Sequence, residues 1–223
     1  MSPLSPFSWR AALYTLGHPG PPPPALLGTA FVLLALCLAT VAVLLWLGDA
    51  WHNEPHHFFR EHQIGTYLSF ANLVATGGVS ALIARRLRPA PSTRFWWWMA
   101  AVLVWTGCDD LFLTHEDIDR VIHALLGLDP NDPITDHIDD LIVAGYGVAA
   151  LALAWVHRVH LASFPWMVLF LAMAFGLFAA LVVLEFTHLP RATEEVVKVV
   201  GGTLTLVGFL AAWLDTRASG GRR

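Results

Sequence analysis

The stretch ALLGTAFVLLALCLATVAVLLWL at residues 25–47 decides the fold, because it holds no charged side chain over its whole length. About 20 apolar residues in a helix are enough to cross the ~30 Å hydrocarbon layer of a bilayer. A Pro-rich arm precedes the stretch where a secretory signal would have a short basic region, and the run is too long for such a signal. The stretch is therefore predicted to be a retained transmembrane helix.

Five further apolar runs of similar length follow, at about 64–84, 95–114, 138–156, 165–185 and 196–214. The chain has 223 residues, of which 56% are hydrophobic and 13% are charged, whereas soluble domains carry about 25% charged residues. Each run must be helical, since lipid offers no hydrogen-bond partners for backbone N–H and C=O groups. We predict an all-α, polytopic integral membrane protein with six transmembrane helices.

The basic residues predict the orientation of the chain. Most of the 13 Lys and Arg lie before the first run, between the second and third, after the fourth or after the sixth. The positive-inside rule places these segments, and with them the N- and C-termini, in the cytoplasm. We expect a Pro-rich cytoplasmic arm at 1–24, a six-helix transmembrane domain at 25–214 and a basic cytoplasmic tail at 215–223. The location predicted is the inner (plasma) membrane of a bacterial cell.

The acidic residues and histidines are distributed in the opposite sense. Asp215 is the only one of the 17 Asp and Glu on the predicted cytoplasmic side, and most of the 11 histidines lie on the outer side. Acidic residues contribute little to membrane topology, so topology does not require this arrangement. Any chemistry of the protein is therefore expected at its outer face.

The outer end of the third run carries Asp109 and Asp110 within apolar sequence. A carboxylate in a membrane helix is costly and requires a partner or a water-filled cavity. On one continuous helix Asp109 would share a face with Glu116, and Asp110 with Asp117. This pattern predicts a polar stripe that leads from the outer surface into the membrane.

Two other helices are predicted to bring polar groups to the same end. The fourth run opens with His137 and Asp140, whose spacing of three residues can present both side chains to one ion. The sixth run opens with Glu194, Glu195 and Lys198. Glu194 and Lys198 are four residues apart, the spacing of a structural ion pair. Such a pair explains Lys198 as well as a role in a functional site does.

Ser69 and Asn72 supply milder polar groups at comparable depth in the second run. Imidazole and carboxylate groups suit zinc, iron or manganese, and such a metal could polarise a carbonyl or activate a water. A hydrogen-bonded acidic network is the alternative, since the chain has no HExxH motif. The predicted divalent-metal ligands are Asp110, His115, His137, Asp140 and Glu195, and the secondary candidates are Asp109, Glu116, Ser69, Asn72, Glu194 and Lys198.

Three further features are expected to be structural. The first outer connection, residues 51–62, combines four histidines with two phenylalanines, as in a short amphipathic segment at the membrane surface. Its histidines are either solvated or bind a metal. Trp96 to Trp98, beside Arg94, are expected in an aromatic belt at the inner boundary. Paired glycines such as Gly77 and Gly201 permit close contact between helices.

Two segments carry a resemblance to known sequences. The patterns Asp109-Asp-…-His115-Glu116 and Glu194-Glu-…-Lys198-…-Gly201 resemble those of uncharacterised bacterial multi-pass membrane proteins. That family has Glu in place of Asp110 and of Lys198, and it implies no activity. The chain also has a fainter similarity to the ceramidase-like and adiponectin-receptor-like membrane hydrolases, but it has six predicted spans rather than seven and lacks their paired His-x-x-x-His.

Two functions follow as hypotheses. The first is a metal-binding membrane protein whose outer site hydrolyses a lipid or amphipathic substrate. The second is a non-catalytic subunit of a larger membrane complex that docks partner subunits through its acidic outer face. A transporter is less favoured, because the inner halves of the spans have almost no ionisable residues. The expected partners are the lipid bilayer and other membrane subunits, with no nucleic acid.

Overall fold

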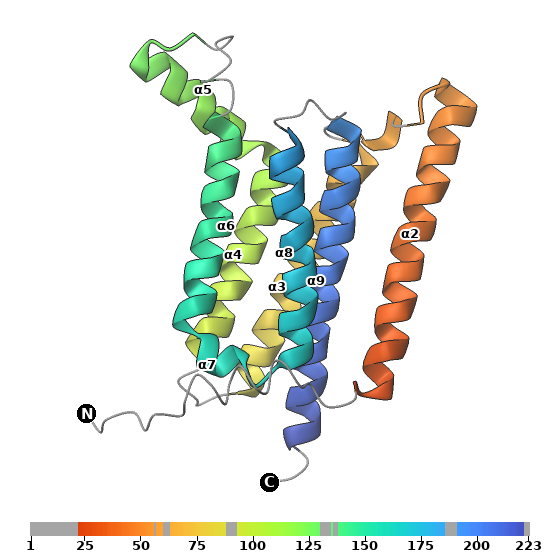
Figure 1. Ribbon diagram of the computed structural model, residues 1–223, viewed down its shortest axis with the longest axis vertical. Helices are drawn as coiled ribbons and strands as arrows, with labels where there is room; N and C mark the ends of the chain where they lie inside the picture. Colours follow the sequence, from red (N-terminus) through yellow and green to blue (C-terminus); the bar gives the residue numbers. More distant parts are fainter. Residues whose placement is uncertain are drawn as a thin grey trace.

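The computed structural model describes residues 22–55, 57–59, 63–87, 93–129, 135, 138–185 and 191–220. This part of the chain is helical and contains no strand, which confirms the predicted all-α class. Long helices run side by side and alternate in direction along the chain (Figure 1). The elements are α2 (Pro24–His52), η1 (His57–Phe59), α3 (Ile64–Arg86), α4 (Thr93–Phe112), α5 (Thr114–Leu126), α6 (Ile138–Val156), α7 (Arg158–Leu161), α8 (Pro165–Glu185) and α9 (Arg191–Gly220).

Three of these helices are long and apolar enough to cross a membrane: α2, α3 and the 193–217 part of α9. Helices α6 and α8 contain shorter apolar stretches. Helix α4 has 20 residues, about 30 Å at 1.5 Å per residue, but its aspartates and tryptophans reduce its hydropathy. The number of spans therefore stays a prediction.

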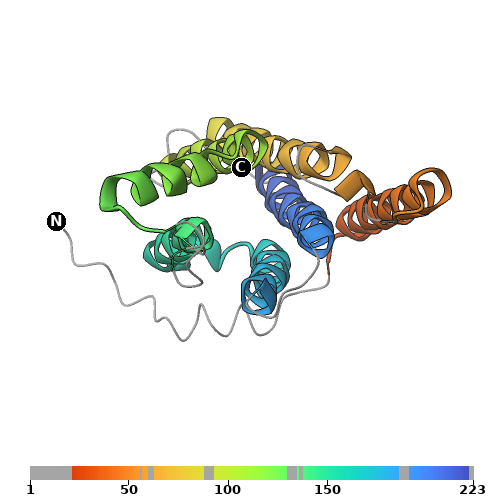
Figure 2. The same cartoon turned by 90° about the horizontal axis from the view of Figure 1, so that it is seen from above.

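Helix α9 is the centre of the bundle. It contacts α2, α3 and α8, while α3 also packs against α4. Viewed from above, α9 lies between α3 and α8, and α2 lies outside it (Figure 2). Close contact depends on glycine at two positions. A Cβ at Gly77 would lie 2.8 Å from Val104 Cγ2, and a Cβ at Gly201 would lie 2.7 Å from the Phe178 ring.

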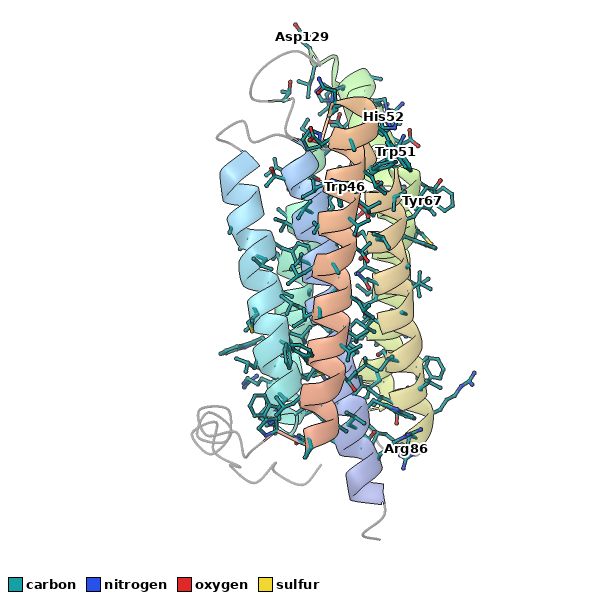
Figure 3. All side chains as sticks on the ribbon, turned by 90° about the vertical axis from the view of Figure 1, so that its right-hand side faces the viewer. Trp46, Trp51, His52, Tyr67, Arg86 and Asp129 are labelled. Atoms are coloured by element: carbon teal, nitrogen blue, oxygen red, sulfur yellow. The ribbon has the colours of Figure 1, made fainter. Side chains whose placement is uncertain are left out.

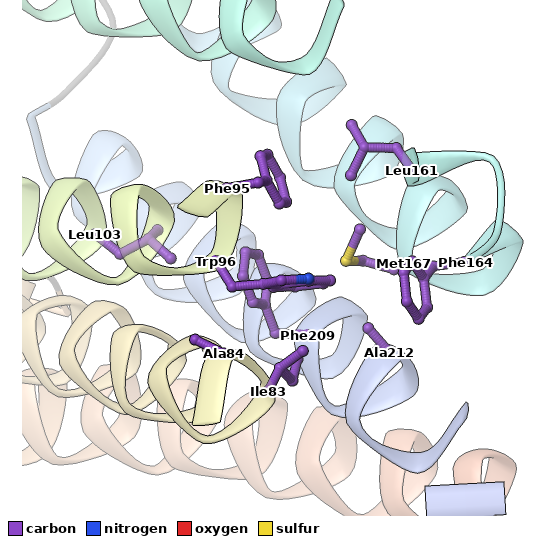
Figure 4. Close-up of a cluster of buried hydrophobic side chains, with 10 residues drawn as sticks. All are labelled: Ile83, Ala84, Phe95, Trp96, Leu103, Leu161, Phe164, Met167, Phe209 and Ala212. Carbon is purple, nitrogen blue, oxygen red and sulfur yellow. The ribbon is translucent and has the colours of Figure 1, made fainter. Parts of the chain in front are cut away.

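The end of the bundle that holds α7 contains the largest apolar cluster (Figure 4). Trp96 is fully buried there, and its indole N–H donates to Nε2 of His160 over 3.0 Å. The expectation of an aromatic belt is therefore wrong for Trp96, which faces α8 and α9 rather than the surface. Trp98 is 63% exposed, as that expectation requires. The cluster comprises Ile83, Ala84, Phe95, Trp96, Leu103, Leu161, Phe164, Met167, Phe209 and Ala212.

The opposite end of the bundle carries the first connection. Trp46, Trp51 and Tyr67 lie on the outside of α2 and α3, whereas Arg86 lies at the other end (Figure 3). Asn53 ends α2 in the left-handed region, with φ of 52°. His52 stacks on His57 at 3.7 Å between ring centroids. Residues 56 and 60–62 of this connection lie outside the described residues.

Candidate functional site

The first two turns of α9 carry three charged groups on one side of the helix. Glu194 lies in the first turn, where a carboxylate complements the positive end of the helix dipole. Lys198 is three residues after Glu195 and four after Glu194, the spacings at which helical side chains meet. The sequence alone thus places both carboxylates beside the Lys198 ammonium.

The structure adds a third carboxylate from a different helix. Lys198 Nζ lies 2.6 Å from Glu194 Oε1, 3.2 Å from Glu195 Oε1 and 3.3 Å from Asp110 Oδ1. Asp110 comes from the last turn of α4, so the ammonium joins α4 to α9. We call Asp110, Glu194, Glu195 and Lys198 the carboxylate cluster.

Asp110 and Glu195 are the shielded members of the carboxylate cluster, with side chains 12% and 6% exposed, whereas Glu194 and Lys198 are 28% and 23% exposed. Oε2 of Glu195 accepts a hydrogen bond from the Thr66 hydroxyl of α3 over 3.3 Å. Gly65 leaves room for the Phe59 ring, which would lie 3.0 Å from a Cβ there, while Glu195 at 3.5 Å would be in ordinary contact. Oδ2 of Asp110 is buried without a hydrogen-bond partner among the described residues. Three carboxylates share one ammonium, so the formal charge of the cluster is negative.

Asp109 faces a different neighbour. It is 3% exposed, and its Oδ2 lies 3.1 Å from Nδ1 of His115. The Tyr146 hydroxyl of α6 is close enough to Asp109 to interact with it. Consecutive residues of an α-helix are rotated by about 100° about its axis, so Asp109 and Asp110 point to different partners.

The predicted continuous polar stripe is wrong. Helix α4 ends at Phe112, and Leu113 adopts the left-handed conformation with φ of 53° before α5 starts at Thr114. This break turns His115 back onto Asp109, six residues earlier. Glu116 is carried away from Asp109, and its carboxylate lies 3.9 Å from Arg120 on α5.

Ser69 and Asn72 lie one to two turns beyond Thr66 along α3. Asn72 Nδ2 donates to the Val199 carbonyl at 3.3 Å and to the Thr203 hydroxyl at 3.1 Å. Ser69 is 3% exposed. These contacts bind α3 to α9, a common role of polar side chains between membrane helices.

The predicted site residues are thus only partly brought together. Asp110, Glu194, Glu195 and Lys198 meet, and beside Asp110 on α4 Asp109 pairs with His115 of α5. His137 lies outside the described residues, and Asp140 is placed in α6 without a described side chain. In the arrangement shown, no three His, Cys, Asp or Glu side chains of the described residues are spaced to hold a metal ion, so metal binding would require side chains to move.

Two contributing residues were not predicted. Thr66 precedes Ser69, Asn72 and Thr76 at intervals of three, three and four residues, so helical periodicity could have identified it. Tyr146 lies about two turns after the start of α6. No pattern in the sequence pairs it with Asp109.

The fold and this cluster define an all-helical bundle with membrane-length apolar helices and buried charges at one end. The sequence model of a family described as "Domain of unknown function (DUF8692)" matches residues 9–213. The chain belongs to this family. No curated protein and no solved structure matches the chain.

Proposed function

We propose that the protein is a six-span inner-membrane protein whose carboxylate cluster, on the outer side, binds a divalent cation. The six helices of 19 to 30 residues support the spans, since about 20 residues cross a bilayer. Arg86 ends α3, Arg158 starts α7 and Arg217 lies in the last turn of α9, all at the end of the bundle opposite the cluster. By the positive-inside rule, that end is cytoplasmic.

The observation that carries the cation proposal is the convergence of three carboxylate oxygens on one cationic atom, Lys198 Nζ. Like charges that approach each other so closely in a poorly hydrated site repel strongly unless cations compensate them. One ammonium leaves two negative charges without compensation, so a further cation is attracted.

An exchange of partners would make room for the metal. Lys198 makes its shortest contact to Glu194, four residues away on the same helix. It can keep this pair while Asp110 and Glu195 turn their oxygens to a metal. Oδ2 of Asp110, buried and without a described partner, is available for it.

Oxygen ligands favour manganese among the metals considered, because carboxylates suit hard cations. A metal at this depth would polarise a carbonyl or activate a water. The substrate class consistent with that position is a lipid or another amphipathic molecule at the outer leaflet.

Elemental analysis of detergent-purified protein tests the proposal. After exposure to Mn²⁺ and desalting, we expect the wild type to retain metal, and Asp110→Asn and Glu195→Gln to lose it. Asp117→Asn is the matched control, because Asp117 is an exposed carboxylate paired with Arg120. Equal retention by Asp110→Asn and the wild type would refute the site, and absence of metal from the wild type would refute the function.

The orientation has a separate test. In a variant with Cys37 and Cys108 replaced, a cysteine at Asp117 should react with a membrane-impermeant maleimide in intact cells, and one at Arg217 should not. The reverse labelling would show that the carboxylate cluster faces the cytoplasm.

A further inference from the structure

Helix α5 turns one row of polar side chains toward the protein. The histidines and Asp119 lie on its inward side. His123 is 6% exposed, and its Nδ1 lies 2.9 Å from Oδ1 of Asp119. His115 points to buried Asp109, as described above. These three polar side chains are therefore turned to the protein, while Asp117 and Arg120, 66% and 67% exposed, remain on the surface.

The apolar side chains of α5 point outward instead. Ile118, Val121 and Leu125 are 39%, 55% and 78% exposed. They recur at intervals of three and four residues, so they share one side of the helix. Leu126, at the end of α5, is 68% exposed. A face of this kind is unfavourable in water and indicates contact with an apolar phase.

The position of α5 identifies that phase. Only Leu113 separates α5 from α4, whose last residue, Phe112, is 68% exposed. Helix α5 leads away from the end of α4 rather than back into the bundle (Figures 1 and 2). It has 13 residues, about 20 Å, which is too short to span a bilayer. An amphipathic helix beside the end of a span lies at the membrane surface.

We propose that the face formed by Ile118, Val121 and Leu125 lies in the outer leaflet, at the boundary between headgroups and acyl chains. This inference depends on the proposed membrane embedding of α4. Helix α5 holds α4 and the Asp109–His115 pair at that depth. It would thereby fix the carboxylate cluster relative to the headgroups.

The charges of α5 select the kind of lipid. Helix α5 contains three acidic residues, Glu116, Asp117 and Asp119, and one arginine, Arg120. Arg120 is already paired with Asp117 at 2.9 Å. Polybasic segments bind anionic lipids, and α5 has the opposite charge. The partner that fits this helix is therefore a zwitterionic lipid surface such as phosphatidylcholine or phosphatidylethanolamine.

Fluorescence quenching by brominated lipid tests this placement. Single cysteines are introduced at Leu125, Arg120 and Trp98 in full-length protein without Cys37 and Cys108, labelled with bimane, and reconstituted in phosphatidylcholine with or without brominated acyl chains. Trp98 is the reference on α4. Arg120, 67% exposed on another side of α5, is the matched control. We expect emission in brominated lipid to fall at Leu125 as much as at Trp98, and to stay unchanged at Arg120.

The results at Trp98 and Leu125 distinguish the membrane embedding of α4 from the placement of α5 in the outer leaflet. Quenching at Trp98 without quenching at Leu125 would overturn the placement of α5 and leave the membrane embedding intact. No quenching at Trp98 would overturn the embedding itself. Pyrene at Leu125 that shows excimer emission, lost on dilution with empty vesicles, would indicate a second copy of the chain and would also overturn the lipid contact.

Discussion

The ion pair between Asp110 and Lys198 should couple α4 to α9, and a double-mutant cycle measures that coupling. The variants are Asp110→Asn, Lys198→Gln and their combination. At 3.3 Å, two unit charges attract by about 5 kcal/mol at an effective dielectric constant of about 20. Desolvation and the 23% exposure of the Lys198 side chain offset much of this, which leaves an expected coupling of about 1–3 kcal/mol.

The assay is the free energy of unfolding, from reversible SDS titration in mixed micelles followed by circular dichroism. Lys198→Gln alone should be the more costly single change, by about 3 kcal/mol or more, because it leaves three carboxylates without their ammonium. The exposed pair Glu116 and Arg120, 3.9 Å apart, is the matched control and should couple by at most about 0.5 kcal/mol. Additive effects of Asp110→Asn and Lys198→Gln, within about 0.5 kcal/mol, would refute the reasoning.

Two further predictions concern the packing of the bundle. Gly77→Ala should lower the free energy of unfolding by about 1–3 kcal/mol, because the added Cβ would overlap with Val104; Gly78→Ala is the control, with nothing within 4 Å, and equal effects of the two changes in the same titration would contradict this packing. His160 accepts the Trp96 hydrogen bond in its neutral form, and burial, with nearby His157, lowers the pKa of His160. The unfolded state therefore binds a proton on His160 more readily than the folded state. The contribution of neutral His160 to the free energy of unfolding should be full above about pH 6.5 and be lost as the pH falls toward the lowered pKa. Thermal unfolding of the wild type and His160→Gln across this range measures it, and the same pH slope in both proteins would argue against the role of His160.

The long helices were predictable from the sequence because their apolar runs match the thickness of a bilayer. The runs expected at 138–156 and 165–185 coincide with α6 and α8, and the run at 64–84 extends only to Arg86. Helix α9 starts before and ends after the run at 196–214, since charged residues can extend a helix beyond its apolar part. Hydropathy identifies apolar segments but does not mark where the helical backbone ends.

The break at Leu113 could not be predicted from hydropathy or turn composition. A leucine in the left-handed region is uncommon, and no Gly, Pro or Asn marks the position. The one available signal was Thr114 followed by Glu116 and Asp117, which resembles the acidic first turn of a new helix. Because this break was not predicted, the contact between His115 and Asp109 could not be predicted either.

The carboxylate cluster was predictable in part. The spacing of Glu194, Glu195 and Lys198 is local, so the sequence identified their common face. The approach of Asp110 to Lys198 depends on the rotation of α4 against α9, which is a property of tertiary packing. The expectation that Asp110 and Glu195 lie together agrees with this geometry, but Lys198 lies between them.

The most direct test of the account is the affinity for Mn²⁺ of the wild type and of Lys198→Gln, measured by electron paramagnetic resonance in the same detergent. Lys198 holds the position of a cation among the three carboxylates, so its removal should strengthen metal binding. We expect tighter Mn²⁺ binding by Lys198→Gln, and loss of that binding when Asp110→Asn is added. Binding by Lys198→Gln that is absent, or weaker than in the wild type while the variant remains folded, would contradict it.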